Sequence, residues 1–325
     1  GMRRDTSACH TLLRQALTSG RESGTGYMFR WLLLGLPRML ATALQAGIET
    51  EYARSLIQRF DIAAESPETE EWPWPIMIHA LGRFEITING APLLFRRKAP
   101  KKPLEMLKYL VAQRGRDVDA PSLTDALWPD ADAGAAKDSF EVTLRRLRKL
   151  LGRDEAVVLR DGKLSLDTKS CWVDTWAVER LQQRTEELLR GTHVGGVPAA
   201  ALHALVERTL NLYPGHLLPG NEELPWMLGY RQHLAGQVMR YLSTVAQRWE
   251  DEQHPERAER LYQRALELDP VAEPMYRRLM DLQARQGRKA EALATYTRCR
   301  HMLSRILCTK PSAETEAVER RLTSS

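Results

Sequence analysis

Hydrophobic positions recur at helical spacing along most of this 325-residue chain, with one interruption near its middle. In residues 6–60 apolar stripes, one of them at Trp31–Leu34, alternate with glycines, and this pattern predicts helical hairpins. Between residues 76 and 99 the period shortens to two, which predicts strands. Helical spacing returns within 101–151, and from about residue 172 it continues to the end. We therefore expect a mainly α protein with a small β component.

The interrupted segment predicts a defined order of strands and helices. Asn89-Gly90 is a tight-turn signal between alternating runs, and Leu93–Phe95 predicts a third strand of an antiparallel sheet. Three helices and a hairpin are expected next, the helices over about 101–114, 121–128 and 137–151 and the hairpin strands over Ala156–Arg160 and Lys163–Asp167. This order favours a winged helix-turn-helix domain.

The helix expected over 137–151 has two contrasting faces. Its apolar positions fall on one side of a helical wheel and predict a face that packs into a core: Phe140, Leu144, Leu147 and Leu151. The opposite face is cationic and almost free of acid: Val142, Arg145, Arg146 and Lys149. A basic helix beside a basic hairpin tipped by Asp161-Gly162 is typical of the part of a winged helix that meets DNA.

Four residues of this helix are candidates for contact with bases. Arg145 or Arg146 can bind guanine with two hydrogen bonds, and Val142 suits a thymine methyl group. Ser139 stands near the start of the helix, where side chains reach base edges. The alternative is an ordinary solvated amphipathic helix, in which arginines such as Arg148 pair with nearby acids.

Other cations are candidates for contact with phosphates, which fix register without reading sequence. Lys149 lies on the cationic face of the helix expected over 137–151. Arg160 and Lys163 flank the turn of the hairpin. Arg97 and Lys101 belong to a second basic cluster before the first helix of the domain. This cluster either contacts the DNA backbone or is a solvated cap.

Composition and charge are compatible with this interpretation. Hydrophobic residues make up 43% of the chain and charged residues 27%, so it can form ordinary cores, and the formal net charge is +5. Residues 76–167 hold 17 lysines and arginines against 13 acids, so most of the excess lies in the segment expected to meet DNA.

The cysteines, histidines and apolar runs exclude several classes of protein. The four cysteines lack metal-ligand spacing and predict small core side chains in a reducing cytoplasm: Cys9, Cys171, Cys299 and Cys308. The histidines form no metal or catalytic constellation, and no cofactor is expected. No apolar run reaches the length of a membrane span, and no secretory signal opens the chain. We expect a cytoplasmic protein that does not engage a membrane.

An internal repeat is the most specific pattern in the second half. Five positions recur with a shift of 34 residues: Leu242, Val245, Ala258, Tyr262 and Ala265 recur as Tyr276, Leu279, Ala292, Tyr296 and Cys299. Thirty-four residues is the tetratricopeptide period. Small alanines permit close helix crossing, and the tyrosines are expected to fill the space opposite. The fold class is therefore a winged helix-turn-helix domain flanked by tetratricopeptide-like helical repeats.

Residues 61–75 have the composition of a linker. The segment DIAAESPETEEWPWP holds five acids, three prolines and two tryptophans. Because two indoles seldom stay solvated, its closing Trp72-Pro73-Trp74-Pro75 is expected to be extended and docked. The expected division is 1–60 for a helical repeat remnant, 61–75 for this linker, 76–170 for the winged helix and 171–325 for the repeats.

Several short motifs occur together in the central segment: Leu81-Gly82-Arg83-Phe84-Glu85-Ile86, Asn89-Gly90, the Leu107–Leu110 helix, Leu127-Trp128-Pro129-Asp130, Leu144–Gly152 and Val173-Asp174. Because of these motifs, residues 78–180 resemble the OmpR-type winged helix of SARP regulators (Streptomyces antibiotic regulatory proteins). Further motifs follow: Tyr213-Pro214-Gly215, Leu217-Leu218-Pro219, Trp226 and Arg231. With these and the repeats, residues 172–322 resemble the bacterial transcriptional activator domain. Residues 6–75 resemble the last repeats of the sensor arrays of MalT-like and LuxR-type regulators.

The resemblance implies a sequence-specific DNA-binding transcriptional regulator, an activator, with double-stranded DNA as its partner. It makes helix 137–151 the recognition helix and Asp161-Gly162-Lys163 the wing. The loop around 128–137 lies where OmpR-type proteins can touch RNA polymerase, and binding to direct repeats implies a second protomer. Lys163 stands where the family often has an aromatic residue, which favours a phosphate or minor-groove contact.

Two other functions compete with DNA binding. The repeats alone predict a protein-interaction scaffold whose winged helix does not bind DNA. An enzyme is not expected, because the sequence offers no nucleophile–base pair, paired carboxylates or metal constellation. The sequence also lacks the phosphate-binding pattern GxxxxGK[ST]. The opening Gly1-Met2 and the helical pattern directly after it lead us to expect a segment of a longer protein.

Overall fold

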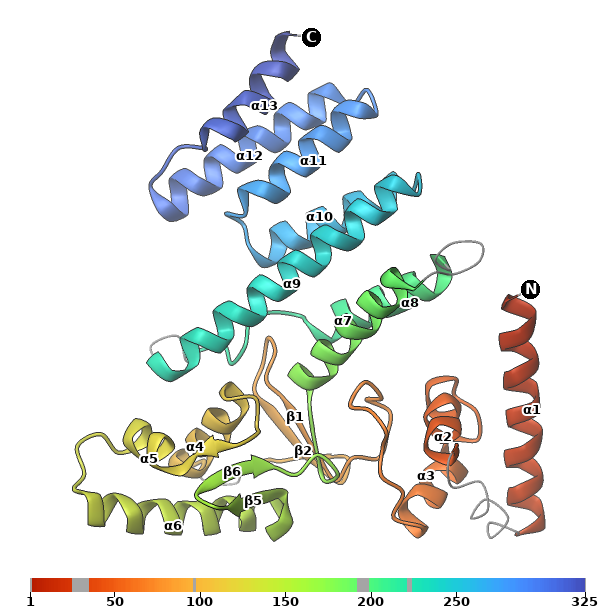
Figure 1. The fold of residues 1–325 in the computed structure, drawn as a ribbon, viewed down its shortest axis with the longest axis vertical. Coiled ribbons are helices and arrows are strands. Elements are labelled where there is room, and N and C mark those ends of the chain that lie inside the picture. Colours follow the sequence, from red (N-terminus) through yellow and green to blue (C-terminus); the bar gives the residue numbers. More distant parts are fainter. Residues whose placement is uncertain (1, 25–34, 96–97, 192–198, 221–223, 325) are drawn as a thin grey trace. The chain divides into compact units, whose positions relative to one another are not determined.

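The computed structural model describes residues 2–24, 35–95, 98–191, 199–220 and 224–324 (Figure 1). These residues form two compact units, unit 1 (Gly1–Gly229) and unit 2 (Tyr230–Ser325). The stripe expected at Trp31–Leu34 and the candidate cation Arg97 lie outside the described residues.

Three helices begin unit 1: α1 (Met2–Ser23), α2 (Leu36–Gln45) and α3 (Thr50–Arg59). Each of α2 and α3 buries one face in their shared core, as the apolar stripes predict. Glu49, directly before α3, ties this pair to α1. It accepts a hydrogen bond from Thr18 at 2.9 Å and pairs with Arg21 at 3.0 Å. The helical character of this segment is confirmed, while its likeness to a sensor array stays a prediction.

The acidic segment 61–75 ends in a packed stretch. Trp72 and Trp74 are each 4% exposed, and the Trp74 indole donates a hydrogen bond to the carbonyl oxygen of Thr69 at 2.8 Å. The expected docking of these two tryptophans is confirmed.

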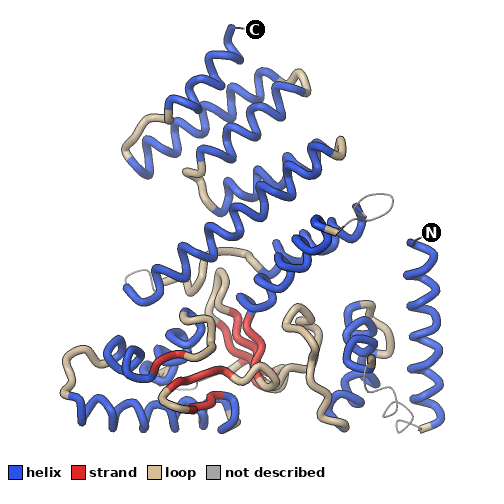
Figure 2. Tube along the Cα trace, in the orientation of Figure 1, coloured by secondary structure: helices blue, strands red, loops and turns tan. Residues whose placement is uncertain are grey.

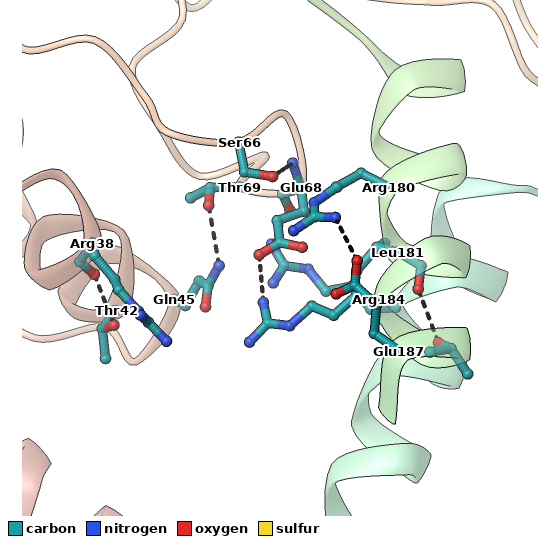
Figure 3. Close-up of polar contacts among 12 residues, drawn as sticks. Arg38, Thr42, Gln45, Ser66, Glu68, Thr69, Arg180, Leu181, Arg184 and Glu187 are labelled. Atoms are coloured by element: carbon teal, nitrogen blue, oxygen red, sulfur yellow. Dashed lines mark hydrogen bonds and ion pairs between the residues drawn. The ribbon is translucent and has the colours of Figure 1, made fainter. Parts of the chain in front are cut away.

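Glu68 fixes the same segment to two later helices, α7 (Asp174–Arg190) and α8 (Ala199–Leu212). Figure 3 shows Arg184 of α7 pointing toward the Glu68 carboxylate, with which it pairs. Arg208 of α8 donates to the Glu68 carbonyl oxygen at 2.5 Å. The segment therefore serves as a brace within unit 1 and not as a loose linker.

A four-stranded sheet lies in unit 1, with the order β3-β2-β1-β7. Its strands are β1 (Ile76–His79), β2 (Glu85–Ile88), β3 (Ala91–Pro92) and β7 (Cys171–Val173). β1 runs antiparallel to β2 and parallel to β7. Figure 2 shows the strands of this sheet and of a second, three-stranded sheet in red. Because β7 begins at Cys171, residues on both sides of the expected 170/171 division share one sheet.

The strand expected at Leu93–Phe95 is wrong. Asn89 and Gly90 both have positive φ, at 50° and 80°, so a two-residue turn starts the return strand at once and places Ala91 opposite Ile88. Leu93 still donates a backbone hydrogen bond to Ile86 at 2.8 Å. Leu94 then leaves the sheet with 82% exposure.

The remaining elements of the central segment are three helices and a three-stranded sheet. The helices are α4 (Lys101–Ala112), α5 (Ala120–Leu127) and α6 (Ala133–Leu151), and they pack against one another. The sheet has the order β4-β6-β5, with β4 (Val118–Asp119), β5 (Val157–Arg160) and β6 (Lys163–Leu166). The hairpin of β5 and β6 was expected, whereas β4 is too short to leave a periodic signal.

Asp174 lies at the start of α7, next to the end of β1. Its buried carboxylate accepts hydrogen bonds from the backbone N–H groups of Ala80 at 2.7 Å and Leu81 at 2.8 Å. It also accepts from the N–H of Thr175 at 2.8 Å. Burial raises the pKa of Asp174 to about 7, although the three donors oppose that shift. One side chain thus fixes the start of α7 to the four-stranded sheet.

A second joint lies beside the first, where the Tyr213-Pro214-Gly215 motif meets Leu81-Gly82. Gly82 donates a backbone hydrogen bond to His216 at 2.8 Å, and Leu218 donates to Ala80 at 2.6 Å. A Cβ on Gly82 would lie 3.0 Å from the Pro214 ring. Motifs far apart in the sequence therefore fit together, and both this close approach and the φ of +69° favour glycine at position 82.

Helical repeats make up unit 2. The helices are α9 (Pro225–Asp251), which begins in unit 1, α10 (Pro255–Leu268), α11 (Glu273–Arg285), α12 (Lys289–Leu307) and α13 (Ala313–Ser324). The ten residues of the 34-residue repeat lie on corresponding helices and all but Tyr296, which is half-buried, are buried. Successive helices from α10 to α13 contact one another. The predicted repeat architecture is confirmed.

The four cysteines divide into two pairs by exposure. Cys171 and Cys299 are fully buried, and burial raises the pKa of each thiol to about 12. Cys9 and Cys308 are exposed, so the expectation that all four are core side chains is wrong for these two. Cys9 lies on an exposed side of α1, and Cys308 directly follows the end of α12 with a φ of 53°. Over the described part of the chain, no helix is both long enough and apolar enough for a membrane span.

Candidate DNA-binding surface

α6 starts four residues before the predicted helix. The Asp132 side chain accepts a hydrogen bond from the N–H of Ala135 at 2.8 Å and caps the helix there, while Gly152 ends it with a φ of 72°. Residues 133–136, expected in a loop, are therefore helical, and the connection from α5 is short. An additional turn of α6 becomes available to a DNA groove.

The two faces of α6 are as the sequence predicts. Its core face is buried against α4 and α5: Ala136, Phe140, Thr143, Leu144, Leu147 and Leu151. Val142 is 41% exposed, and Arg145, Arg146 and Lys149 are exposed beside it. Among the described residues these three cations have no ion-pair partner. Ser139 is half-buried, so it is less accessible than the other four candidates.

Arg148 stands apart from the exposed cations. It is half-buried, and its Nε and Nη2 both donate to the carbonyl oxygen of Val157, at 2.9 and 2.7 Å. The expected alternative, in which Arg148 pairs with an acid, is wrong. Val157 is the first residue of β5, so this fork fixes the hairpin to the helix.

The tip of the hairpin is a two-residue turn. Asp161 and Gly162 have φ of 48° and 74°, the pair of positive angles that a type I′ turn requires, and Arg160 lies opposite Lys163. Both cations are exposed. Lys163 also lies opposite Asp119 of β4 and helps to hold the pKa of that carboxyl below its usual value, after two hydrogen bonds from Ser122.

The second basic cluster is partly engaged within the domain. Lys102 donates to the carbonyl oxygen of Leu127 at 2.6 Å, which caps the end of α5, and pairs with Glu105 at 3.1 Å. Lys101 lies 3.7 Å from Glu105 with a side chain 80% exposed. The charged group of Lys101 therefore remains accessible to a ligand, whereas that of Lys102 caps α5.

Two residues that the sequence interpretation missed belong to this surface. Asp138 is exposed and lies one turn before Val142 on the same face of α6. A carboxylate there can accept a hydrogen bond from the amino group of cytosine. Leu159 is 40% exposed on β5, near the turn of the hairpin. Asp138 lies within the helix predicted over 137–151, so the helical wheel could have found it, but no sequence signal marks Leu159.

Comparisons with known proteins concern the family and the fold of the chain. Residues 173–323 match the family model of the bacterial transcriptional activator domain. The regulatory protein AfsR of Streptomyces griseus is 27% identical over 238 residues, which cover 72% of this chain. The chain spans only 23% of the length of that relative.

A solved structure shares the fold. It is Mycobacterium tuberculosis EmbR in complex with a low-affinity phosphopeptide, with a TM-score of 0.57 and 19% identity, covering 77% of this chain and 65% of that one. Residues 173–323 therefore form a bacterial transcriptional activator domain, and the chain is similar to SARP-type transcriptional regulators, as the motifs of its sequence predicted.

Proposed function

We propose that this chain is a sequence-specific DNA-binding transcriptional activator that inserts α6 into the major groove. Arg145 and Arg146 bind guanine, Val142 meets a thymine methyl group, and Ser139 and Asp138 extend the reading face toward the start of the helix. The observation that carries the proposal is the exposed basic face of α6, whose arginines have no ion-pair partner among the described residues.

The hairpin supplies the second contact in this proposal. Arg160 and Lys163 reach a phosphate or the minor groove, and Lys149 and Lys101 hold further phosphates. Arg148 sets the distance between α6 and the hairpin through its two hydrogen bonds to the carbonyl oxygen of Val157. The base-reading residues of α6 and the two cations of the hairpin are therefore on elements that the Arg148 side chain links.

In this proposal, RNA polymerase contacts the loop between α5 and α6. Pro129 and Asp130 are exposed between the cap of α5 and the start of α6. A contact there leaves the recognition face of α6 free for DNA. Direct repeats in the target would place a second protomer beside the first.

Fluorescence anisotropy tests DNA binding with the full chain and a pool of promoter fragments from its own genome at two salt concentrations. The expected result is selective binding that strengthens at low salt and is lost in Arg145→Ala/Arg146→Ala. Arg300→Ala/Arg305→Ala is the matched control, because both arginines are exposed on α12 and the change in net charge is equal. Equal, weak binding by all three proteins would favour the protein-interaction scaffold.

A further inference from the structure

A hollow of about 650 Å³ lies within unit 2, between alternate helices of the repeat. α11 and α13 provide most of its lining, with Gln247 of α9 and Lys289 at the start of α12. Stacked helix pairs commonly present such a surface as a binding face. The hollow is large enough for several side chains of a ligand.

The lining of this hollow carries an excess of positive charge. Four cations line it, Arg278, Arg285, Lys289 and Arg321, against a single acid, Asp281. Arg321 pairs with Asp281 at 3.0 Å, and Arg285 pairs with the buried carboxylate of Glu250. Arg278 and Lys289 are exposed and have no ion-pair partner in the described part of the chain. Two charges in the hollow therefore remain uncompensated.

Apart from Gln247, the remaining lining is apolar. Val318 and Leu322 of α13 are buried and belong to a cluster with Met280 and Ala292, against which Ala284 packs. The hollow thus combines cations with the largely buried edge of an apolar cluster. A ligand that matches both carries anionic groups, such as carboxylates, and at least one apolar side chain.

We propose that this hollow binds a short acidic peptide segment of a partner protein, with carboxylates on Arg278 and Lys289 and an apolar side chain over Val318 and Leu322. A duplex is the less suitable polyanion, because its phosphates lie on the outside of a broad cylinder and offer nothing to an apolar floor. The inference concerns unit 2 alone, so it does not depend on DNA binding by α6.

Anisotropy of fluorescein-labelled peptides with the full chain tests this inference. The acidic probe is Asp-Glu-Leu-Glu-Asp-Leu-Glu, and the uncharged probe has Asn and Gln in place of the acids. A third probe keeps the acids and has Ser in place of both leucines. Saturable binding of the acidic probe is expected, at least about tenfold tighter than that of either other probe.

Two variants localise the binding. Arg278→Gln/Lys289→Gln should weaken binding of the acidic probe by about tenfold or more, whereas Arg300→Gln/Arg305→Gln on α12 should leave it unchanged. All four positions are exposed, and thermal melting verifies that both variants fold. The inference is overturned if the acidic probe does not bind, if the uncharged probe binds equally, or if both variants bind like the original chain. Binding of a random duplex that the Arg278→Gln/Lys289→Gln change abolishes would also overturn it, in favour of a nucleic-acid surface.

Discussion

Arg148 of α6 donates two hydrogen bonds to one acceptor, the backbone carbonyl oxygen of Val157, at 2.9 Å from Nε and 2.7 Å from Nη2. The fork spans the junction between the candidate recognition helix and the hairpin. A planar guanidinium can hold such a geometry, whereas an ammonium group can occupy only one position of it.

Arg148→Ala should therefore lower both stability and DNA affinity. Loss of a charged donor pair to a buried acceptor is expected to cost about 2 kcal/mol in the free energy of unfolding, measured by urea denaturation. Arg148→Lys should recover only part of this loss. Arg153→Ala is the control, since Arg153 forms an exposed pair with Glu155 and should change stability by less than about 0.5 kcal/mol. Equal stability of the Arg148→Ala and Arg153→Ala chains would refute this role.

Asp174 should be the most sensitive polar residue of unit 1. Asp174→Ala leaves the N–H groups of Ala80, Leu81 and Thr175 without their acceptor and is expected to cost about 3 kcal/mol. Asp174→Asn keeps one acceptor oxygen and should cost less. Urea denaturation of both variants measures the difference, and the same free energy for the two would show that the hydrogen bonds are not the cause.

Asp174 should also make stability depend on pH. Burial raises its pKa in the folded chain to about 7, whereas the usual value for an unfolded Asp is about 4. Between these values the folded chain binds more protons, so the contribution of this group is full below about pH 4 and is lost as the pH rises toward about 7. Relative to Asp174→Asn, the original chain should therefore lose stability over this range. Urea midpoints of both proteins measured across it test the effect, and a constant difference would contradict it.

Gly115 should resist substitution for two reasons. Its φ is +67°, and an added Cβ would lie 2.7 Å from the Trp176 ring. Gly152 has a similar φ of +72° but open space around the added Cβ. Gly152→Ala should therefore show the backbone cost alone, about 1 kcal/mol, and Gly115→Ala should cost at least about 1 kcal/mol more. Thermal denaturation compares the two, and equal losses would mean that the Trp176 contact relaxes freely.

The two pairs of cysteines should react differently with a thiol reagent. Cys9 and Cys308 are exposed and should be modified in the folded chain, whereas Cys171 and Cys299 are buried with pKa raised to about 12. Titration should therefore count two reactive thiols before denaturation and four after it. Four rapidly reacting thiols in the folded chain would show that the core around β7 or α12 is open.

Local periodicity could predict the elements that later carry the candidate functions. The apolar stripe and basic face of α6, the Asp161-Gly162 turn and the 34-residue repeat all depend on neighbours along the chain. β7 could not be predicted in this way. Its three residues form a strand only because β1, far away in the sequence, lies beside them in parallel register.

The same limit applies to single side chains at the joints. Asp174 was part of a family motif in the sequence, but its role depends on backbone donors 93 and 94 residues away. Arg148 looked like one more cation of a basic helix, since periodicity cannot show that a carbonyl oxygen of the next strand lies within reach. Local sequence pattern thus predicts the faces of a helix, and the tertiary fold decides which side chains of a face remain available to a ligand.

Direct reading of bases by α6 is the central claim, and selection of binding sites from a random duplex library tests it most directly. The full chain, Arg145→Ala, Arg146→Ala and Lys149→Ala are each put through the same selection. The proposal predicts a defined site for the original chain and relaxed preference at particular base pairs for the arginine variants. Lys149→Ala should bind the same site more weakly, as expected for a phosphate contact. No enriched site, or an unchanged site in both arginine variants, would contradict base reading by this helix.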